Sequence, residues 1–227
     1  MIKAIYFDVG HTLVNLYGAD KSELFKNQYH NCYGPSSKAD LLRKATIVSE
    51  IFHQKNCLME LTDREEFWIR YYQAGLGAMN YSKSDSYRKA KEIYSFENPK
   101  KSLTLIEGVI PMLNDLKKKG YYLGVISNWN SNLEKDLAAL NIDKYFDTII
   151  SSESVGVEKP NTKIFLEALG QFSPDETLMV GDLYYFDVLP ALSIGMEAVL
   201  FDSVGCLNDI FGVRSMQKIE QLIDFLR

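Results

Sequence analysis

The sequence has little cysteine and no long apolar run. Its three cysteines among 227 residues are Cys32, Cys57 and Cys206, and no two of them have CxxC spacing. This pattern excludes a disulfide framework and a cysteine-rich zinc site, and it predicts reduced thiols. No segment approaches the roughly 20 apolar residues of a membrane span. Lys3 and Asp8 interrupt the N-terminal apolar run too early for a signal peptide. We therefore expect a cytoplasmic protein with no membrane partner.

The sequence also lacks an excess of basic residues. It has 25 Lys and Arg against 30 Asp and Glu, a formal net charge of -5. This balance argues against nucleic acid as the main partner. A small anionic ligand stays possible, because one local pocket can be positive on an acidic protein. The length suits one domain, or a core domain with an insertion. Oligomeric state is not predicted.

Apolar strands and helices alternate over most of the chain. Strands are predicted at 2–7, 121–127, 147–152, 177–182 and 197–202. Helices are predicted at 108–119, 161–170, 187–195 and 216–227, with another that contains Leu133, Leu137 and Leu140. This alternation is typical of an α/β fold, a parallel sheet covered on both faces.

Residues 16–103 have a different character, because they are polar and show helical periodicity. One helical face carries Leu41, Ala45, Val48 and Phe52, and Thr62 with Glu65 predicts a capping box before an aromatic helix. About four helices and no strand are expected here. The sequence therefore predicts a core made of residues 1–15 and 104–227, with an all-helical insertion at 16–103.

Polar residues follow the predicted strands at their carboxyl ends, where open α/β sheets bind ligands. Asp8 ends the first strand, Ser127 the second and Asp182 the fourth, while Lys159 lies in the loop after the third and Asp187 follows Asp182. Each residue alone is an ordinary turn, cap or surface residue. Their shared position at successive strand ends indicates a site.

This set of side chains suits phosphoryl transfer. Asp8 can act as a nucleophile that forms an aspartyl-phosphate. Asp182, with Asp187 through water, can hold Mg²⁺, which prefers carboxylates, water and phosphate oxygens. Ser127 can bind a phosphoryl oxygen, and Lys159 can neutralise the charge of the acidic residues and the transferring group.

Four motifs resemble those of the haloacid dehalogenase-like hydrolases. They are FDVGHTL (7–13), VISN (125–128), VEKP (157–160) and VGDLYYFD (180–187), in the family's order and spacing. The resemblance implies a Rossmann-like parallel-sheet core, with residues 16–103 as a C1-type cap that selects substrate. It implies that Asp8 is nucleophile and metal ligand, and that Asp182 and Asp187 form the metal site. Ser127 and Asn128 would hold phosphate or order the site, Lys159 would balance charge, and Thr12 would support the motif-one turn.

Gly10 departs from the pattern of family phosphatases. These usually carry a second aspartate two residues after the nucleophile, which acts as general acid and then as general base. Glycine cannot do this, although it keeps the backbone carbonyl through which the family contacts the metal at this position. His11 is adjacent and ionises near neutral pH, so it is one candidate to replace the missing acid. A cap residue, or a substrate whose leaving group needs little protonation, is another solution.

The favoured prediction is a Mg²⁺-dependent phosphatase that acts on a small phosphorylated metabolite through an aspartyl-phosphate. Three alternatives stay open. A dehalogenase would dispense with the metal, which the Asp182/Asp187 pair argues against. A phosphonate hydrolase would need a cap lysine, for which Lys44 and Lys55 are candidates. A binding protein would hold a phosphorylated ligand or partner without useful turnover.

Overall fold

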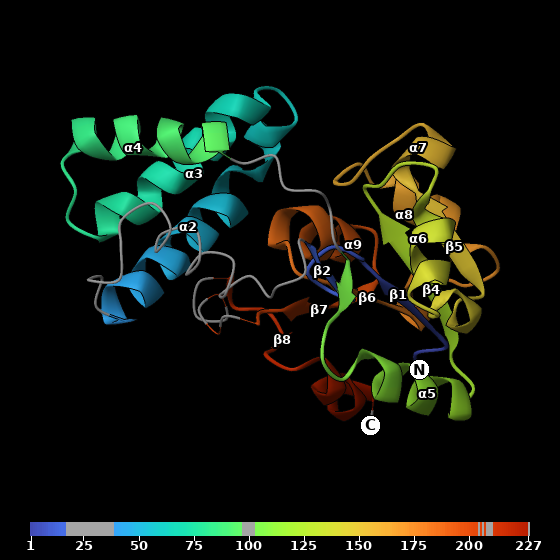
Figure 1. Ribbon diagram of the computed structural model, residues 1–227. Coiled ribbons are helices and arrows are strands. Elements are labelled where there is room, and N and C mark those ends of the chain that lie inside the picture. Colours follow the sequence, from blue (N-terminus) through green and yellow to red (C-terminus); the bar gives the residue numbers. More distant parts are fainter. Residues whose placement is uncertain (17–38, 97–102, 204, 206, 208–210, 227) are drawn as a thin grey trace. The chain divides into compact units, whose positions relative to one another are not determined.

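The computed structural model describes residues 1–16, 39–96, 103–203, 205, 207 and 211–226. Its contacts divide the chain into two compact units. The first, here called the core unit, comprises Met1–Gly18 and Leu103–Arg227. The second, the helical unit, comprises Ala19–Ser102. Figure 1 shows the elements of both.

A six-stranded sheet forms the centre of the core unit, with the strand order β5-β4-β1-β6-β7-β8. The strands are β1 (Ala4–Phe7), β4 (Tyr122–Ser127), β5 (Thr148–Ser151), β6 (Thr177–Gly181), β7 (Glu197–Phe201) and β8 (Ser215–Met216). All five pairings between neighbours are parallel. The parallel α/β core predicted from the sequence is confirmed.

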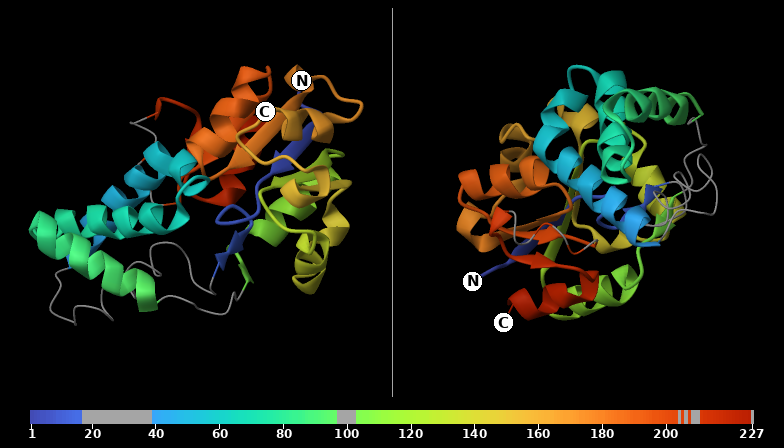
Figure 2. Two further views of the ribbon diagram at one scale, coloured as in Figure 1. Left: turned by 90° about the horizontal axis from the view of Figure 1, so that it is seen from above. Right: turned by 90° about the vertical axis from the view of Figure 1, so that its left-hand side faces the viewer.

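Helices cover both faces of this sheet (Figure 2). They are α5 (Val109–Lys118), α6 (Leu133–Ala139), α7 (Ser152–Val155), α8 (Lys163–Leu169) and α9 (Leu189–Ser193), with the 3₁₀ helices η2 (Asp143–Tyr145), η3 (Pro174–Glu176) and η5 (Ile219–Leu226). Side chains alternate along β1, as strand geometry requires. Ile5 and Phe7 pack into the cluster formed with α5, α6 and η5. Tyr6 takes the opposite face, where its hydroxyl donates to the Ala168 carbonyl of α8 at 2.8 Å.

Three local features differ from the sequence predictions. Two very short strands, β2 (Val14–Asn15) and β3 (Thr104–Leu105), pair antiparallel. The predicted closing helix begins three residues late, because 215–216 join the sheet as β8, and the rest is the 3₁₀ helix η5. Two-residue strands carry too little periodicity to be detected in a sequence. The helix expected at 187–195 begins earlier, as the π-helix η4 (Tyr184–Val188).

The helical unit contains α2 (Ala39–Glu60), α3 (Arg64–Ala78) and α4 (Lys83–Phe96). Residues 17–38, where part of the predicted helical content falls, lie outside the described residues. The aliphatic and aromatic core of the three helices consists of Ala45, Ile69, Tyr71, Tyr72, Leu76, Ala90 and Ile93. Within the described part of the chain, no helix has both the length and the apolar character needed to cross a bilayer.

The N-terminus of α3 is capped one residue later than the sequence pattern predicts. The Asp63 carboxylate accepts a hydrogen bond from the Glu66 amide at 3.1 Å. The Thr62 hydroxyl instead donates to the Met59 carbonyl, also at 3.1 Å. The predicted Thr62–Glu65 capping box was therefore wrong. Asp and Thr are both good N-cap residues, so adjacent candidates are hard to separate by sequence.

We predict that Gly124→Ala destabilises the core unit. A methyl group at this position of β4 would lie 2.5 Å from Cδ1 of Tyr6 and 2.8 Å from Cγ2 of Thr148. Such overpacking typically costs about 1–3 kcal/mol. Urea denaturation measures the change in unfolding free energy. Gly77→Ala in α3 is the control, because nothing lies within 4 Å of a methyl group there. An equal loss for both variants would contradict this packing argument.

Candidate active site

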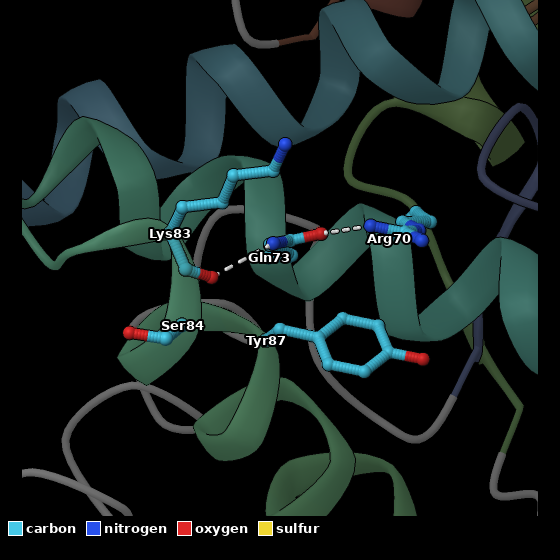
Figure 3. A pocket seen from close by; sticks show the side chains of 5 residues that line it. All are labelled: Arg70, Gln73, Lys83, Ser84 and Tyr87. Atoms are coloured by element: carbon cyan, nitrogen blue, oxygen red, sulfur yellow. Dashed lines mark hydrogen bonds between the residues drawn. The ribbon is translucent and has the colours of Figure 1, made fainter.

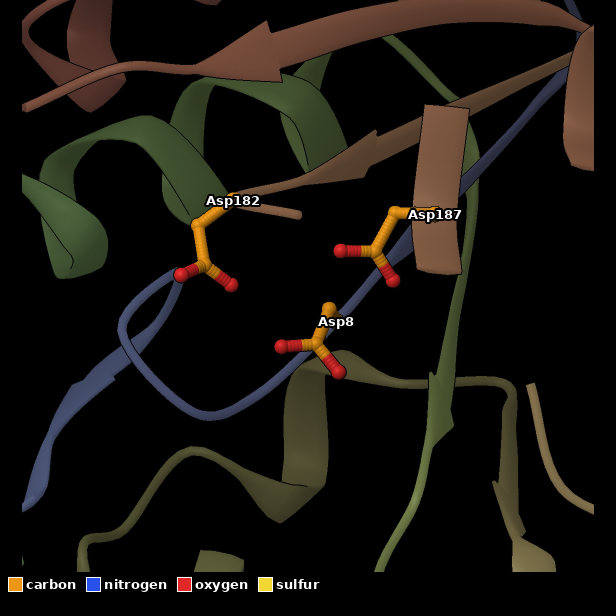
Figure 4. Close-up of side chains that lie close together, drawn as sticks. All are labelled: Asp8, Asp182 and Asp187. Carbon is orange, nitrogen blue, oxygen red and sulfur yellow. The ribbon is translucent and has the colours of Figure 1, made fainter. Parts of the chain in front are cut away.

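Three buried aspartates meet at the carboxyl ends of β1 and β6. Asp8 follows β1, Asp182 follows β6, and Asp187 lies in η4. Each offers a carboxylate oxygen, and these oxygens all lie within 4.8 Å of one another. Figure 4 shows the three side chains lying close together. Their exposed fractions are only 8, 5 and 1%. Carboxylates this close and this buried repel one another unless cations compensate them.

Lys159 supplies one such cation. Its Nζ lies 2.6 Å from Oδ1 of Asp8 and 2.5 Å from Oδ1 of Asp187. The lysine side chain is 3% exposed. Burial alone would lower the pKa of Lys159, but the carboxylates of Asp187 and Asp8 outweigh it and raise that pKa above its ordinary range. The ammonium group is therefore charged at any physiological pH.

Asp187 is held on both of its oxygens. Oδ1 accepts from Lys159, and Oδ2 accepts from the Leu183 amide at 2.9 Å. Burial is the main cause that raises the pKa of Asp187 to about 7; Asp8 and Asp182 add to the increase, and Lys159 opposes it. Gly181 makes room for this side chain, since a methyl group there would lie 2.3 Å from Cγ of Asp187.

Two hydroxyl groups also contact the cluster. Ser127, at the end of β4, donates to Oδ1 of Asp8 at 3.0 Å. Thr12 is fully buried, and its hydroxyl lies 3.4 Å from Oδ1 of Asp182. Both contacts to Asp8, from Ser127 and Lys159, converge on the same oxygen. The carboxylate of Asp8 therefore has one oxygen fixed in place by protein donors.

The turn after Asp8 is wound around a single carbonyl. The Val9 oxygen accepts from the amides of Thr12, Leu13 and Val14, at 3.3, 2.9 and 3.0 Å. This wrapping places His11 in the left-handed region at φ 58°, which histidine tolerates better than most residues. The backbone of Gly10 needs no such conformation.

Gly10 is not required by sterics. A methyl group there would contact Leu16 at 3.6 Å and Trp129 at 3.8 Å, which are ordinary van der Waals distances. The wall beside position 10 is thus apolar. Trp129 was not singled out by the sequence, because a tryptophan after a strand carries no signal of its own. Its indole Nε1 donates to Oδ2 of Asp136 at 2.8 Å.

Asn128 uses both ends of its carboxamide on the backbone of one residue. Nδ2 donates to the Lys159 carbonyl at 2.9 Å, and Oδ1 accepts from the Lys159 amide at 2.7 Å. The structure thus ties the end of β4 to the loop that carries the lysine. The sequence resemblance gave Asn128 two alternative roles, to hold phosphate or to order the site. It did not predict this pairing, because nothing local links two residues 31 positions apart.

The structure brings most of the predicted site residues together. A connected set of contacts, including the acidic cluster, joins Asp8, Thr12, Ser127, Asn128, Lys159, Asp182 and Asp187. Gly10 and His11 lie in the turn that follows Asp8. Lys44 and Lys55, the candidates for a phosphonate hydrolase, are both exposed in α2.

A pocket of about 510 Å³ lies elsewhere, in the helical unit between α3 and α4 (Figure 3). Arg70, Gln73, Lys83, Ser84 and Tyr87 line it. Arg70 is already bonded to Glu66 and to Gln73, and Gln73 donates to the Lys83 carbonyl. Since these groups satisfy one another, the pocket gives no indication of a ligand.

Comparison with known proteins agrees with this geometry. A family model described as haloacid dehalogenase-like hydrolase matches residues 6–201. A relative from Methanothermobacter thermautotrophicus, named glyceraldehyde 3-phosphate phosphatase, is 30% identical over 223 residues, or 89% of this chain and 87% of the relative. One of the same name from Pyrococcus furiosus is 35% identical over 212 residues, or 88% and 80%.

Solved structures show the same fold. The putative HAD-hydrolase YfnB from Bacillus subtilis matches with a TM-score of 0.62 at 19% identity, over 100% of this chain and 99% of that one. At this identity the likeness concerns the fold alone. Together with the family model, it places the chain in a class of hydrolases with an α/β core.

The chain belongs to the haloacid dehalogenase-like hydrolases, and the predicted family is confirmed. Its acidic cluster offers the oxygen ligands that a hard divalent cation prefers.

We predict that Lys159→Met strongly destabilises the protein in the absence of divalent cations. The change removes the cation between Asp8 and Asp187 and leaves buried carboxylates uncompensated. Breaking a buried pair in this way typically costs about 3–5 kcal/mol. Unfolding free energy measured in EDTA tests this.

Lys117→Met is the matched control for that experiment. Lys117 also forms an ion pair, with Asp147 at 2.8 Å, but both side chains are 35% exposed. Exposed pairs contribute about 1 kcal/mol or less. Similar losses for the two variants would show that Lys159 is not the compensating charge of the cluster.

Proposed function

We propose that this protein is a Mg²⁺-dependent phosphatase that acts on a small phosphorylated metabolite through an aspartyl-phosphate. One observation carries the proposal: Asp8 sits within a buried cluster of acids, with one oxygen fixed by Ser127 and Lys159. A carboxylate in this setting suits nucleophilic attack on phosphorus. The relatives named glyceraldehyde 3-phosphate phosphatase support a small phosphate ester as substrate.

The proposed reaction has two displacements at phosphorus. In the first, an oxygen of Asp8 forms a bond to phosphorus, the ester P–O bond breaks, and the leaving oxygen takes a proton. In the second, water attacks the aspartyl-phosphate, which releases inorganic phosphate and restores the carboxylate. Ser127 and Lys159 hold Asp8 for both steps, and Lys159 offsets the charge of the transferring phosphoryl group.

The donor set fits Mg²⁺. Asp8 and Asp182 would hold it, with the Gly10 carbonyl, while Asp187 lies behind them against Lys159. When bound, the cation would supply further positive charge beside the phosphoryl oxygens. Asp187, with both oxygens engaged, is better placed to orient Lys159 than to bind the cation directly.

Two roles stay predictions: His11 as a replacement acid, and residues 16–103 as a substrate-selecting cap. His11→Gln tests the first, since it removes the titrating imidazole and keeps a polar side chain. Loss of activity at neutral pH in that variant would support the role. The exposed positions of Lys44 and Lys55 give no support to the phosphonate hydrolase alternative.

The central prediction is that the protein hydrolyses p-nitrophenyl phosphate when Mg²⁺ is present. EDTA and Asp8→Asn should each abolish release of p-nitrophenol, because the first removes the cation and the second the nucleophile. Asp136→Asn is the control, since Asp136 contacts Trp129 and lies outside the cluster. Activity that survives in Asp8→Asn would contradict the proposal. Ligand-induced stabilisation without turnover would favour a binding protein instead.

A second prediction concerns the leaving group. Position 10 has no acidic side chain and is bordered by Leu16 and Trp129, so protonation of the leaving oxygen should limit the rate. A general acid typically contributes about 10²–10⁴ in rate. Across a series of aryl phosphates, kcat/KM should therefore fall steeply as the leaving-group pKa rises.

Gly10→Asp is the companion experiment, because the backbone and the surrounding space accept a side chain at this position. It should flatten the dependence of rate on leaving-group pKa and raise turnover of alkyl phosphates. A flat dependence in the unmodified protein would show that another group already supplies the proton, and His11→Gln would then identify or exclude the histidine.

A further inference from the structure

Two loops lie side by side at the carboxyl end of the sheet and are joined by a row of hydrogen bonds. One loop follows β4 and begins at Asn128; the other follows β5, begins with the short helix α7 and ends at Lys159. The Trp129 carbonyl accepts from the Ser152 hydroxyl at 3.2 Å and from the Glu153 amide at 3.3 Å. The Ser131 amide donates to the Glu153 carboxylate.

Asn128 and Lys159 form the pair in this row that leads into the catalytic cluster. Asn128 directly follows Ser127, which donates to Asp8, and its carboxamide meets the amide and carbonyl of Lys159 at 2.7 and 2.9 Å. The carboxamide thus satisfies both the backbone amide and the backbone carbonyl of Lys159, as a residue of a neighbouring β-strand would. Each end of the carboxamide thus has a partner in the Lys159 backbone, which favours a structural role for this side chain.

This pairing fixes the point from which the lysine side chain starts. A lysine has four flexible side-chain bonds, so its ammonium group is placed only as well as its backbone is placed. Here the backbone is held at two atoms, and the side chain runs from it to Asp8 and Asp187, buried along its length. A displacement of about 1 Å at a catalytic group can cost about 10²-fold in rate.

We propose that Asn128 is a positioning residue that acts through Lys159, and that its side chain does not bind phosphate. The expected loss of kcat rests on the proposed phosphatase function. The placement of Lys159 by Asn128 does not depend on that function. It gives Asn128, the last residue of the VISN motif, the role of positioning the lysine in the VEKP motif.

The variants are chosen to remove one or both hydrogen bonds between the Asn128 carboxamide and the Lys159 backbone. Asn128→Ala removes both hydrogen bonds. Asn128→Asp keeps the acceptor for the Lys159 amide but places a carboxylate oxygen against the Lys159 carbonyl, so it is the conservative variant with one bond lost. Ser152→Ala is the matched control, because it removes one bond between the same two loops without touching Lys159.

The kinetic test compares these variants with p-nitrophenyl phosphate and Mg²⁺. Asn128→Ala should lower kcat by about 10–100-fold, Asn128→Asp by less, and Ser152→Ala by less than about twofold. An unchanged kcat in Asn128→Ala would overturn the proposal. Equal losses in Asn128→Ala and Ser152→Ala would also overturn it, because the effect would then belong to the loops in general.

A double-mutant cycle separates positioning from phosphate binding. The affinity for inorganic phosphate with Mg²⁺ is measured by calorimetry in the Lys159→Met background, with and without Asn128→Ala. If Asn128 acts through the lysine, its removal changes nothing once the lysine is gone. A further loss of phosphate affinity in the double variant would mean that Asn128 contacts phosphate itself, and the proposal would be wrong.

A chemical measurement needs no turnover. Lys159 is buried, so acetic anhydride should modify it slowly in the folded protein, as read by mass spectrometry. Asn128→Ala should raise this rate about tenfold or more, while Ser152→Ala should not. Circular dichroism checks that each variant is folded. If Asn128→Ala does not fold, the modification rate is measured in Asn128→Asp instead. If the unmodified protein shows no turnover, the phosphatase proposal fails. The rate at which acetic anhydride modifies Lys159 then decides the role of Asn128 by itself.

Discussion

The site depends on one buried ammonium group placed between two carboxylates. Asp8 and Asp187 are brought together by different parts of the sheet, and without Lys159 their charges would oppose the fold that assembles them. The same contact explains the high pKa of the lysine, whereas burial is the main cause of the raised pKa of Asp187 and the lysine opposes that increase. Stability and reactivity at this sheet edge thus come from one arrangement of charge.

The parallel topology makes that arrangement possible. Because all strands of the sheet run in one direction, their carboxyl ends share an edge, and side chains from residues 8, 127 and 182 meet there. The sequence allowed this to be predicted, since the apolar strands and the polar residues that follow them are both visible in the chain. The place of Asp8 at the end of the first strand was visible in the sequence, but its proposed role as nucleophile rests on the whole set of polar residues at the strand ends.

Other features could not be predicted, and each has a physical reason. The pairing of Asn128 with the Lys159 backbone joins residues distant in the chain through atoms that every residue has, so no residue type marks it. The apolar wall of Leu16 and Trp129 beside Gly10 also arises only from folding. The missed strands are two residues long, and the capping of α3 differs by one residue between two side chains of similar capping strength.

The close approach of Asp187 to Gly181 has a consequence for how this sequence can change over time. The space that a side chain at 181 would need is already filled by the carboxylate at 187. A larger residue at 181 therefore becomes acceptable only after the acid at 187 has been lost. That loss would also remove one ion-pair partner of Lys159. The glycine of the VGD stretch is thus kept by an epistatic link to a residue six positions further along, not by the conformation of its own backbone.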